Sequence, residues 1–247
     1  MTDSQDRPFV FPAWANYLLP VILLVAVGAG MYVPATTYYM LSAGTLNPGY
    51  LPQQPVPYSH ELHVGELGMD CTYCHNTVDE AAFAAIPPTQ TCIACHNPET
   101  NASGIRKNSD KLQPVYDSYR SGEPVKWVKV HDLADYAYFN HSAHINKGVG
   151  CYSCHGRVDK MGEEGVYQVE NLSMGWCIEC HREPEKHLRP LDQVTSMTYH
   201  TGEGPNDLQA QAGETLEQAQ LRVGLRLKET NNIHSIAYMT SCSTCHR

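Results

Sequence analysis

The chain has 247 residues, and its 26 acidic residues outnumber its 17 Lys and Arg to give a formal net charge of −9. This acidic balance argues against a nucleic-acid-binding protein, which needs clustered basic side chains on its contact surface. Only four Phe occur beside 18 Gly and 16 Pro, so the composition favours loops over a large aromatic core.

The first long feature is an apolar segment near the N-terminus. No Asp, Glu, Lys or Arg occurs between Pro8 and His60, and residues 18–33 are densely apolar. A helix of about 20 apolar residues is long enough to span a bilayer. We therefore expect a transmembrane anchor over residues 13–42, preceded by a cytoplasmic tail over residues 1–12.

A cleaved signal peptide is the alternative interpretation of this segment. Its apolar part would be shorter, with a positively charged stretch before it and a small-residue cleavage site after it. The leader MTDSQDR instead holds two acids and one Arg, and no convincing Ala-x-Ala site follows. These features favour an uncleaved anchor, and Arg7 agrees with a cytoplasmic N-terminus under the positive-inside rule.

Five copies of Cys-x-x-Cys-His follow the apolar segment and use every cysteine of the chain. Each copy is typical of a c-type haem attachment site, in which both thiols form thioethers and the histidine becomes the proximal iron ligand. We therefore expect five covalently bound haem c groups. The motifs are Cys71, Cys74 and His75; Cys92, Cys95 and His96; Cys151, Cys154 and His155; Cys177, Cys180 and His181; and Cys242, Cys245 and His246.

Zinc sites and disulfides are the competing interpretations of these cysteines. A zinc site needs ligand pairs that close a tetrahedron, but it does not need a histidine directly after every second cysteine. A disulfide framework has no use for that histidine either. Because haem is attached to such motifs outside the cytoplasm, we expect the haem domain on the periplasmic side of the inner membrane.

The chain contains an internal duplication. The segment that begins YSHELH and continues with CTYCHNTVD aligns with one that begins FNHSAH and continues with CYSCHGRVD. A second motif follows in each copy, as CIACHNPE and CIECHREPE. The expected segments are a Pro-rich linker (43–57), di-haem module 1 (58–99), an inter-module segment (100–137), di-haem module 2 (138–190) and a C-terminal segment with the fifth haem (191–247).

Five haems leave little protein for each cofactor. The roughly 200 residues after the anchor amount to about 40 per haem, which is too few for an ordinary core around every group. We expect a mainly α and irregular multihaem cytochrome c fold, with short helices and loops wrapped around five haems. Between the modules, NSDKLQPVYDSYRSG suggests a helix broken near Pro114, and PVKWVKV is β-prone. Residues 214–228 show a helical apolar stripe that suits packing on a haem.

Histidines outside the motifs are candidates for the distal iron ligands. The aromatic-x-His-x-x-His element of each module resembles that of the small class III multihaem cytochromes c, whose two histidines ligate different haems. The resemblance implies that His60 and His141 ligate the first haem of their own modules. It implies that His63 and His144 reach the second haem of a module or cross between modules.

The fifth distal ligand has several candidates. His131 is the expected distal ligand of the fifth haem. His187, His200 and His234 are the fallback candidates. Met174 and Met197 are alternatives, and Met/His ligation would raise the potential relative to bis-His ligation. Since distal candidates outnumber irons, no haem needs an open position. This favours electron transfer over a reductase acting on nitrite, peroxide or sulfur compounds.

Several stretches resemble the pentahaem subunit of alternative complex III. They are residues 138–162, residues 172–185 with Leu-Arg-Pro just after, and the terminal CSTCHR. The resemblance implies an electron-transfer subunit of a membrane-bound quinol:electron-acceptor oxidoreductase in respiratory or photosynthetic electron transport. In that family, a polytopic membrane subunit oxidises quinol and an iron–sulfur subunit collects the electrons. The pentahaem subunit then passes them to a monohaem cytochrome or another soluble acceptor.

A self-sufficient quinol dehydrogenase that donates to periplasmic reductases is the alternative function. Such a protein holds a haem close to the bilayer to meet quinol. Here the spacer LNPGYLPQQPVPYSH separates the apolar segment from the first motif. The spacer counts against this alternative without excluding it.

Overall fold

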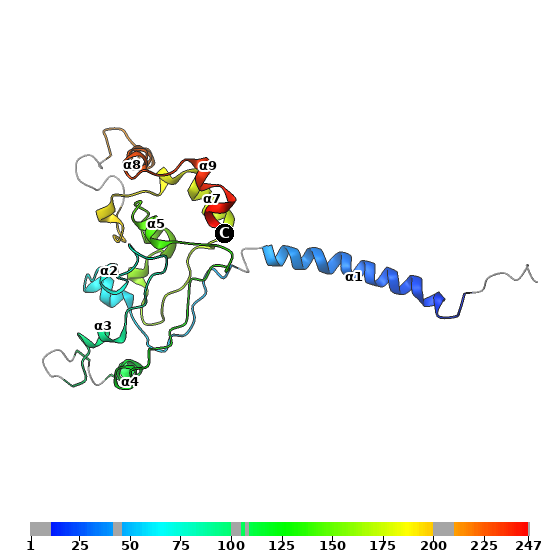
Figure 1. The fold of residues 1–247 in the computed structure, drawn as a ribbon, viewed down its shortest axis with the longest axis horizontal. Coiled ribbons are helices and arrows are strands. Elements are labelled where there is room, and N and C mark those ends of the chain that lie inside the picture. Colours follow the sequence, from blue (N-terminus) through cyan, green and yellow to red (C-terminus); the bar gives the residue numbers. More distant parts are fainter. Residues whose placement is uncertain (1–10, 42–45, 100–104, 107–108, 200–209, 247) are drawn as a thin grey trace, which may run out of the picture. The chain divides into compact units, whose positions relative to one another are not determined.

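The computed structural model describes residues 11–41, 46–99, 105–106, 109–199 and 210–246, and Figure 1 shows the course of the chain. The chain divides into two units, Met1–Leu46 and Asn47–Arg247. The expected tail over residues 1–12 therefore lies mostly outside the described residues.

The N-terminal unit contains one long helix, α1 (Ala15–Leu41). Within Ala15–Met40, an 18-residue window has a mean hydropathy of 2.1, so this helix is long and apolar enough to cross a membrane. Pro20 and Pro34 lie inside it, and a membrane helix tolerates such prolines. The predicted apolar helix is present, while a membrane anchor and a signal sequence both have this length and composition.

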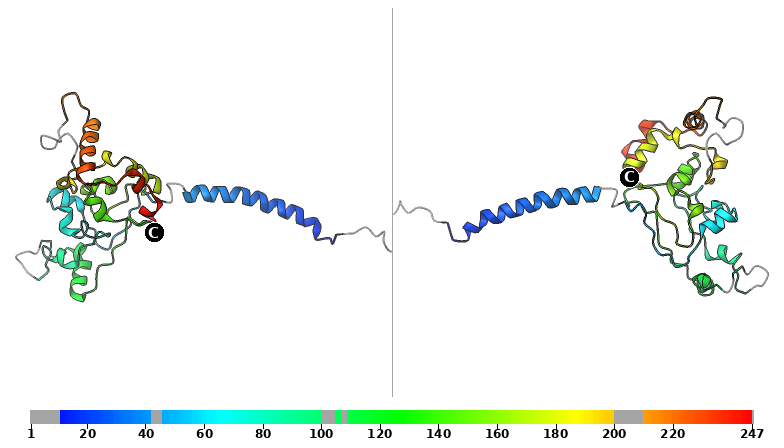
Figure 2. Two further views of the ribbon diagram at one scale, coloured as in Figure 1. Left: turned by 45° about the horizontal axis from the view of Figure 1, so that its top comes forward. Right: turned by 180° about the vertical axis from the view of Figure 1, so that it is seen from behind.

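The second unit consists of short helices joined by long irregular segments (Figures 1 and 2). Its described part contains no β-strand, although an isolated antiparallel bridge joins Val149 to Leu188. The expected helical and irregular fold class is thus confirmed. The helical elements before the fourth motif are η2 (Glu61–Glu66), α2 (Cys71–Cys74), α3 (Thr89–Ile93), η3 (Asp110–Leu112), α4 (Gln113–Ser121), α5 (His141–Ile145), α6 (Tyr152–His155) and η4 (Val158–Lys160). Those from the fourth motif onward are α7 (Met174–Arg182), η5 (Pro184–Lys186), η6 (Leu191–Gln193), α8 (Leu216–Thr230), α9 (Ile236–Met239) and α10 (Cys242–Cys245).

The protein core of this unit is small. Its main cluster joins α3 to α4 through the buried side chains of Val56, Ile93, Val115 and Tyr116. Large apolar side chains remain exposed elsewhere, including Phe83 at 76%. A chain with so small a core needs further apolar surface to bury, and porphyrin rings would supply it.

The inter-module segment differs in two details from the local prediction. Pro114 lies in the first turn of α4 and does not break the helix, because proline at that position loses no intrahelical hydrogen bond. Residues 124–130 form no strand. Instead, the main chain of Val128 hydrogen-bonds in both directions with the side chain of Gln54, at 2.9 and 2.8 Å.

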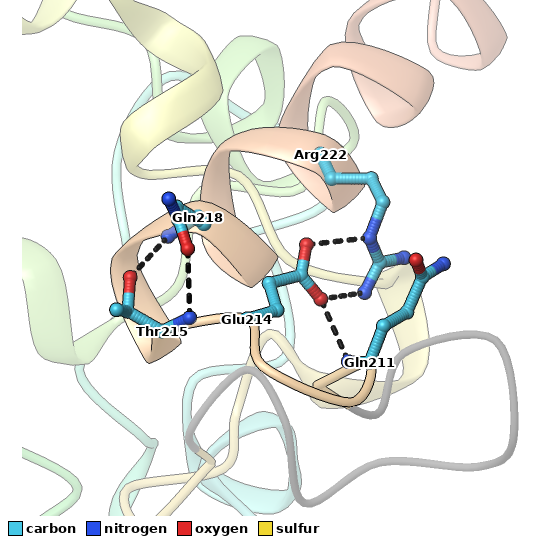
Figure 3. Close-up of polar contacts among 5 residues, drawn as sticks. All are labelled: Gln211, Glu214, Thr215, Gln218 and Arg222. Carbon is cyan, nitrogen blue, oxygen red and sulfur yellow. Dashed lines mark hydrogen bonds and ion pairs between the residues drawn. The ribbon is translucent and has the colours of Figure 1, made fainter.

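Helix α8 is capped by side chains at its N-terminus (Figure 3). Thr215 Oγ1 accepts from the Gln218 main-chain N–H at 3.2 Å, and Gln218 Oε1 accepts from the Thr215 N–H at 2.9 Å. Arg222 donates to both carboxylate oxygens of Glu214 at 2.9 and 2.8 Å. These bonds lower the pKa of Glu214 to about 2, chiefly through Arg222. The capping box satisfies N–H groups that a helix end leaves without partners.

The packed face of α8 lies against η5. Ala219 and Val223 of the predicted stripe are buried, while Leu216 is exposed. Gly224 lies so close to η5 that a Cβ there would collide with the carbonyl of Glu185. Part of the stripe therefore packs on protein.

The two modules are joined by main-chain hydrogen bonds between residues at matching positions of the duplication. The Ser142 N–H, at the start of module 2, donates to the carbonyl of Ala81 in module 1 at 3.2 Å. In the opposite direction, the Glu61 N–H of module 1 donates to the carbonyl of Met161 in module 2 at 3.0 Å. The duplication aligns Glu61 with Ser142 and Ala81 with Met161, so the exchange is reciprocal.

Candidate haem sites

Each Cys-x-x-Cys-His motif lies on one turn of helix. The histidine N–H donates to the carbonyl of the first cysteine in four motifs, as at His75 and Cys71 (2.9 Å) and at His246 and Cys242 (2.9 Å). A helical turn places residues three and four apart on one face. Both thiols and the histidine can therefore approach one planar cofactor from the same side.

The motif histidines are oriented by main-chain carbonyls. In four motifs, Nδ1 donates a hydrogen bond of 2.7 to 2.9 Å. A ring whose Nδ1 carries the proton presents the lone pair of Nε2 to a metal. The donor and acceptor pairs are His75 with Ala85, His96 with Ile105, His181 with Met239, and His246 with Tyr136.

The repeated aromatic-x-His-x-x-His element adopts the same geometry in both modules. The ring centroids of Tyr58 and His63 are 4.4 Å apart, with an interplanar angle of 22°. Those of Phe139 and His144 are 4.5 Å apart at 28°. His63 Nδ1 donates to Ser59 O at 2.8 Å, and His144 makes the equivalent bond at 2.7 Å. The second histidine of each element is therefore fixed in the tautomer that suits a metal ligand.

The second histidine of each element faces the second motif of its own module. The ring centroids of His63 and His96 are 6.2 Å apart, and those of His144 and His181 are 6.1 Å apart. Two imidazoles bound on opposite sides of one metal, with metal–nitrogen bonds of about 2 Å, have centroids about 6 Å apart. The spacing in both modules thus fits a metal between the two rings.

The first histidine of each element lies near the first motif of its module. The His141 and His155 rings are 6.5 Å apart with an interplanar angle of 12°. His141 Nδ1 donates to Ala82 O of module 1 at 2.9 Å, across the module boundary. In module 1, burial, together with the nearby rings of His75 and His63, lowers the pKa of His60 to about 4.

Among the described residues, two histidine ring nitrogens are buried without a hydrogen-bond partner, namely Nδ1 of His60 and Nε2 of His131. A buried polar atom of this kind normally costs about 1–3 kcal/mol. A metal bond to the ring removes that cost for the ligating nitrogen. The orphaned Nε2 of His131 therefore fits an iron ligand.

The structure places His131 near the third motif. Its ring centroid is 4.5 Å from that of His155, whereas the ring recorded beside His246 is that of Tyr136, at 5.9 Å. The sequence offered no signal for this position, and the ligation of the fifth haem by His131 stays a prediction.

The other candidates for distal iron ligands lie at separate places in the described chain. Met174 is 65% exposed at the start of α7, and Met197 lines a cavity of about 330 Å³ beside Cys71. His187 and His234 are exposed, and the His234 ring lies 4.3 Å from that of Tyr238. His200 lies outside the described residues.

Cysteines of different motifs lie close together, and their contacts give the order of the motifs in space. Burial raises the pKa of Cys92, and nearby Cys74 raises it further, which links the second motif to the first. A hydrogen bond to Cys151 raises the pKa of Cys71 and links the first motif to the third. The spatial order therefore begins with the second, first and third motifs.

The same contacts continue to the C-terminus. Burial, together with nearby Cys180, raises the pKa of Cys154 to about 12, which links the third and fourth motifs. Burial also raises the pKa of Cys177, and Cys245 of the fifth motif raises it further. These neighbouring cysteines thus connect the five motifs in a row of contacts, in the order second, first, third, fourth and fifth.

The ten cysteines carry no disulfide. Among the described residues, no three His, Cys, Asp or Glu side chains are grouped to hold a bare metal ion. The paired imidazoles, the orphaned ring nitrogens and the exposed apolar side chains fit haem.

Two comparisons with known proteins bear on this arrangement. Residues 56–112 match the family model of cytochrome c7 and related cytochrome c. The chain is also similar to the menaquinone reductase multihaem cytochrome c subunit of Nitratidesulfovibrio vulgaris, with 32% identity over 103 residues. That match covers 42% of this chain and 46% of the relative, so the chain spans about half the length of the relative. The chain is thus similar to multihaem cytochromes c, and residues 56–112 resemble those of the cytochrome c7 type.

Proposed function

We propose that the chain is a membrane-anchored pentahaem c-type cytochrome that relays electrons within a quinol:electron-acceptor oxidoreductase similar to alternative complex III. The observation that carries this proposal is the single row of five motifs, in which pairs of histidine rings are spaced to hold an iron between them. A protein that only stored or sensed electrons would not need an unbroken row.

Ten thioethers and ten axial ligands would hold the cofactors. Haem c, when bound, supplies a one-electron iron couple whose potential depends on its axial ligands and surroundings. His75, His96, His155, His181 and His246 would be the proximal ligands. His60, His63, His141 and His144 would be distal ligands to the first, second, third and fourth haems. The predicted distal ligand of the fifth haem is His131, although its ring lies beside that of His155 in the third motif, and Met174 and Met197 are its alternatives.

With haem bound, the chain's own residues would restrict the chemistry to electron transfer. Histidine rings on both sides of an iron would leave no position for a substrate, and the carbonyls of Ala82, Ser59 and Asn140 hold the predicted distal rings in place. Fixed ligands also reduce the rearrangement that accompanies each change of charge. The proposed role is therefore a relay between partners.

The proposed partners follow from helix α1, from the resemblance to alternative complex III and from the relative described above. Helix α1 would anchor the chain in the inner membrane, with the haem domain on the periplasmic side. The relative is named as a subunit of a menaquinone reductase, which supports a quinone-linked complex. Electrons would arrive from an iron–sulfur subunit beside a polytopic membrane subunit and leave to a monohaem cytochrome or another soluble acceptor.

A self-sufficient quinol dehydrogenase is the second candidate. Helix α1 favours it, because one anchored chain can meet quinol at the membrane surface. The two candidates differ in whether the isolated subunit accepts electrons from a quinol analogue.

The test begins with solubilisation of native membranes in mild detergent. The proposal expects five haems per chain by pyridine haemochrome assay, together with copurified iron–sulfur and polytopic subunits. Isolation of the chain without those subunits would contradict the complex, and rapid reduction of the isolated chain by a quinol analogue would support the second candidate. A haem content far below five per chain would contradict both.

A further inference from the structure

A buried arginine lies beside the third motif. Arg189 is only 9% exposed, and its Nη1 donates to Ser196 O at 2.8 Å and to Gln193 O at 3.4 Å. Its guanidinium carbon is 5.4 Å from the ring centroid of Tyr199. The recorded partners of this guanidinium within the described part of the chain are thus carbonyls and an aromatic ring, without a carboxylate.

This arrangement differs from that of other arginines in the unit. Arg157 and Arg222 each form a bidentate pair with a carboxylate, that of Asp159 or Glu214. A buried charge without an opposite charge is costly and rare. Burial lowers the pKa of Arg189, yet a guanidinium stays protonated in proteins. Among the described residues, no carboxylate is paired with this guanidinium to balance its charge.

The backbone fixes this charge next to the haem-attachment segment. The Arg189 N–H donates to Gly148 O at 2.8 Å. A Cβ at Gly150, the residue before Cys151, would collide with the Arg189 guanidinium. Position 150 thus has room for the guanidinium because it is glycine. The Cys151 N–H donates to Val194 O at 3.0 Å and the Cys71 thiol to Thr195 O at 3.9 Å, so the charge lies where the first and third motifs meet.

We infer that Arg189 raises the reduction potential of the haem held by the third motif, and of the first-motif haem that adjoins it. The inference rests on the proposed function, in which both motifs carry haem. Reduction adds one negative charge near the guanidinium, and a buried cation stabilises that charge more than water would. Arg189 contributes no iron ligand, and it acts through its field alone.

A functional consequence follows for the relay. The first and third motifs occupy the second and third places in the row of five. If their haems have raised potentials, electrons collect in the middle of the row before they continue to the fourth and fifth haems. The arginine would therefore set where the chain holds its first electrons.

The experiment compares the full-length variants Arg189→Gln and Arg189→Lys by optical redox titration of the five haems. Glutamine keeps a donor for Ser196 O but removes the charge, whereas lysine keeps the charge. We expect Arg189→Gln to move one or two of the five components to lower potential and Arg189→Lys to resemble the wild type. Arg120→Gln is the matched control, because Arg120 is exposed on α4 beside Asp117, and it should shift none.

Two results would overturn the inference: a titration of Arg189→Gln that superimposes on the wild type, or equal shifts in the Gln and Lys variants. Should Arg189→Gln fail to accumulate, Ser196→Asp places a carboxylate next to the guanidinium, with Ser196→Asn as its neutral control. The same downward shift is then expected only for Asp, and its absence overturns the inference. A wild-type protein without haem would instead contradict the proposed function, so the two failures are distinguishable.

Discussion

The ring of Tyr58 stacks on the ring of His63, with centroids 4.4 Å apart and planes 22° apart. The same residue meets the ring of His60 edge-on, at 4.8 Å and 84°. One aromatic side chain thus sets the orientation of two histidines that face different motifs. Phe139 repeats both contacts with His141 and His144, so the tyrosine hydroxyl is not needed for the arrangement.

Replacement of Tyr58 tests this relationship. Tyr58→Ala should destabilise the protein by about 0.5–1.5 kcal/mol beyond the loss of buried area, because aromatic pairs contribute that much. It should also free the His63 ring and let the second haem bind carbon monoxide when reduced. Denaturant unfolding and a carbon monoxide difference spectrum measure the two effects. Tyr58→Phe is the control and should match the wild type. If it lowers stability and admits carbon monoxide as much as Tyr58→Ala does, the hydroxyl is needed and the stacking argument is wrong.

Removal of His144 should open one haem. The thioether cysteines are untouched, so His144→Ala is expected to keep five haems while the fourth loses its sixth ligand. Carbon monoxide should then bind to about one haem per chain in the reduced protein. The exposed His187 offers the matched change His187→Ala, which should leave binding at the wild-type level. If both variants behave alike, the pairing of His144 with the fourth motif is wrong.

Helix α8 offers a packing test at Gly224. Gly224→Ala should cost about 1–3 kcal/mol, because an added methyl group in a filled contact forces the backbone to shift. Gly175→Ala is the control, since the nearest heavy atom to a Cβ there is Ser173 Oγ at 3.8 Å and alanine favours a helix. Thermal unfolding of both variants measures the difference. If Gly224→Ala leaves the stability unchanged, α8 does not pack closely against η5.

Glu214 should make stability depend on pH in the acid range. Arg222 lowers its pKa from 4.5 to about 2 in the folded protein. The folded state therefore binds this proton less readily, and the stabilising contribution is complete above pH 4.5 and lost as the pH falls through 2. The stability difference between the wild type and Glu214→Gln should shrink over that window. A difference that stays constant with pH would contradict the ion pair.

The haem-attachment motifs and the repeated histidine elements could be predicted, because the first are fixed sequence patterns and the second occur twice in the chain. A Cys-x-x-Cys-His motif needs only one turn of helix, so the geometry around Cys71 and Cys74 follows from local sequence. The aligned Tyr58 and Phe139 elements predicted a repeated structure, which their ring geometry now shows. The apolar helix and the helical, irregular fold class were likewise predicted.

The partners that orient the rings could not be predicted. They are main-chain carbonyls, such as Ile105 O for His96 and Tyr136 O for His246, and any residue can supply a carbonyl. The prediction of a strand from the β-prone residues 124–130 was wrong. A strand needs a neighbouring strand to pair with, and the described part of the chain contains none. The position of His131 beside His155 also depends on chain folding between distant segments.

The reciprocal bonds between Ser142 and Ala81 and between Glu61 and Met161 have a consequence for biogenesis. Module 1 is synthesised first, yet η2, which carries the predicted ligand His63, hydrogen-bonds with a residue made about 100 positions later. If the chain is exported and binds haem as proposed, its first two haems can be attached early but gain their final surroundings only when module 2 arrives. Haem attachment would then precede complete folding of the chain.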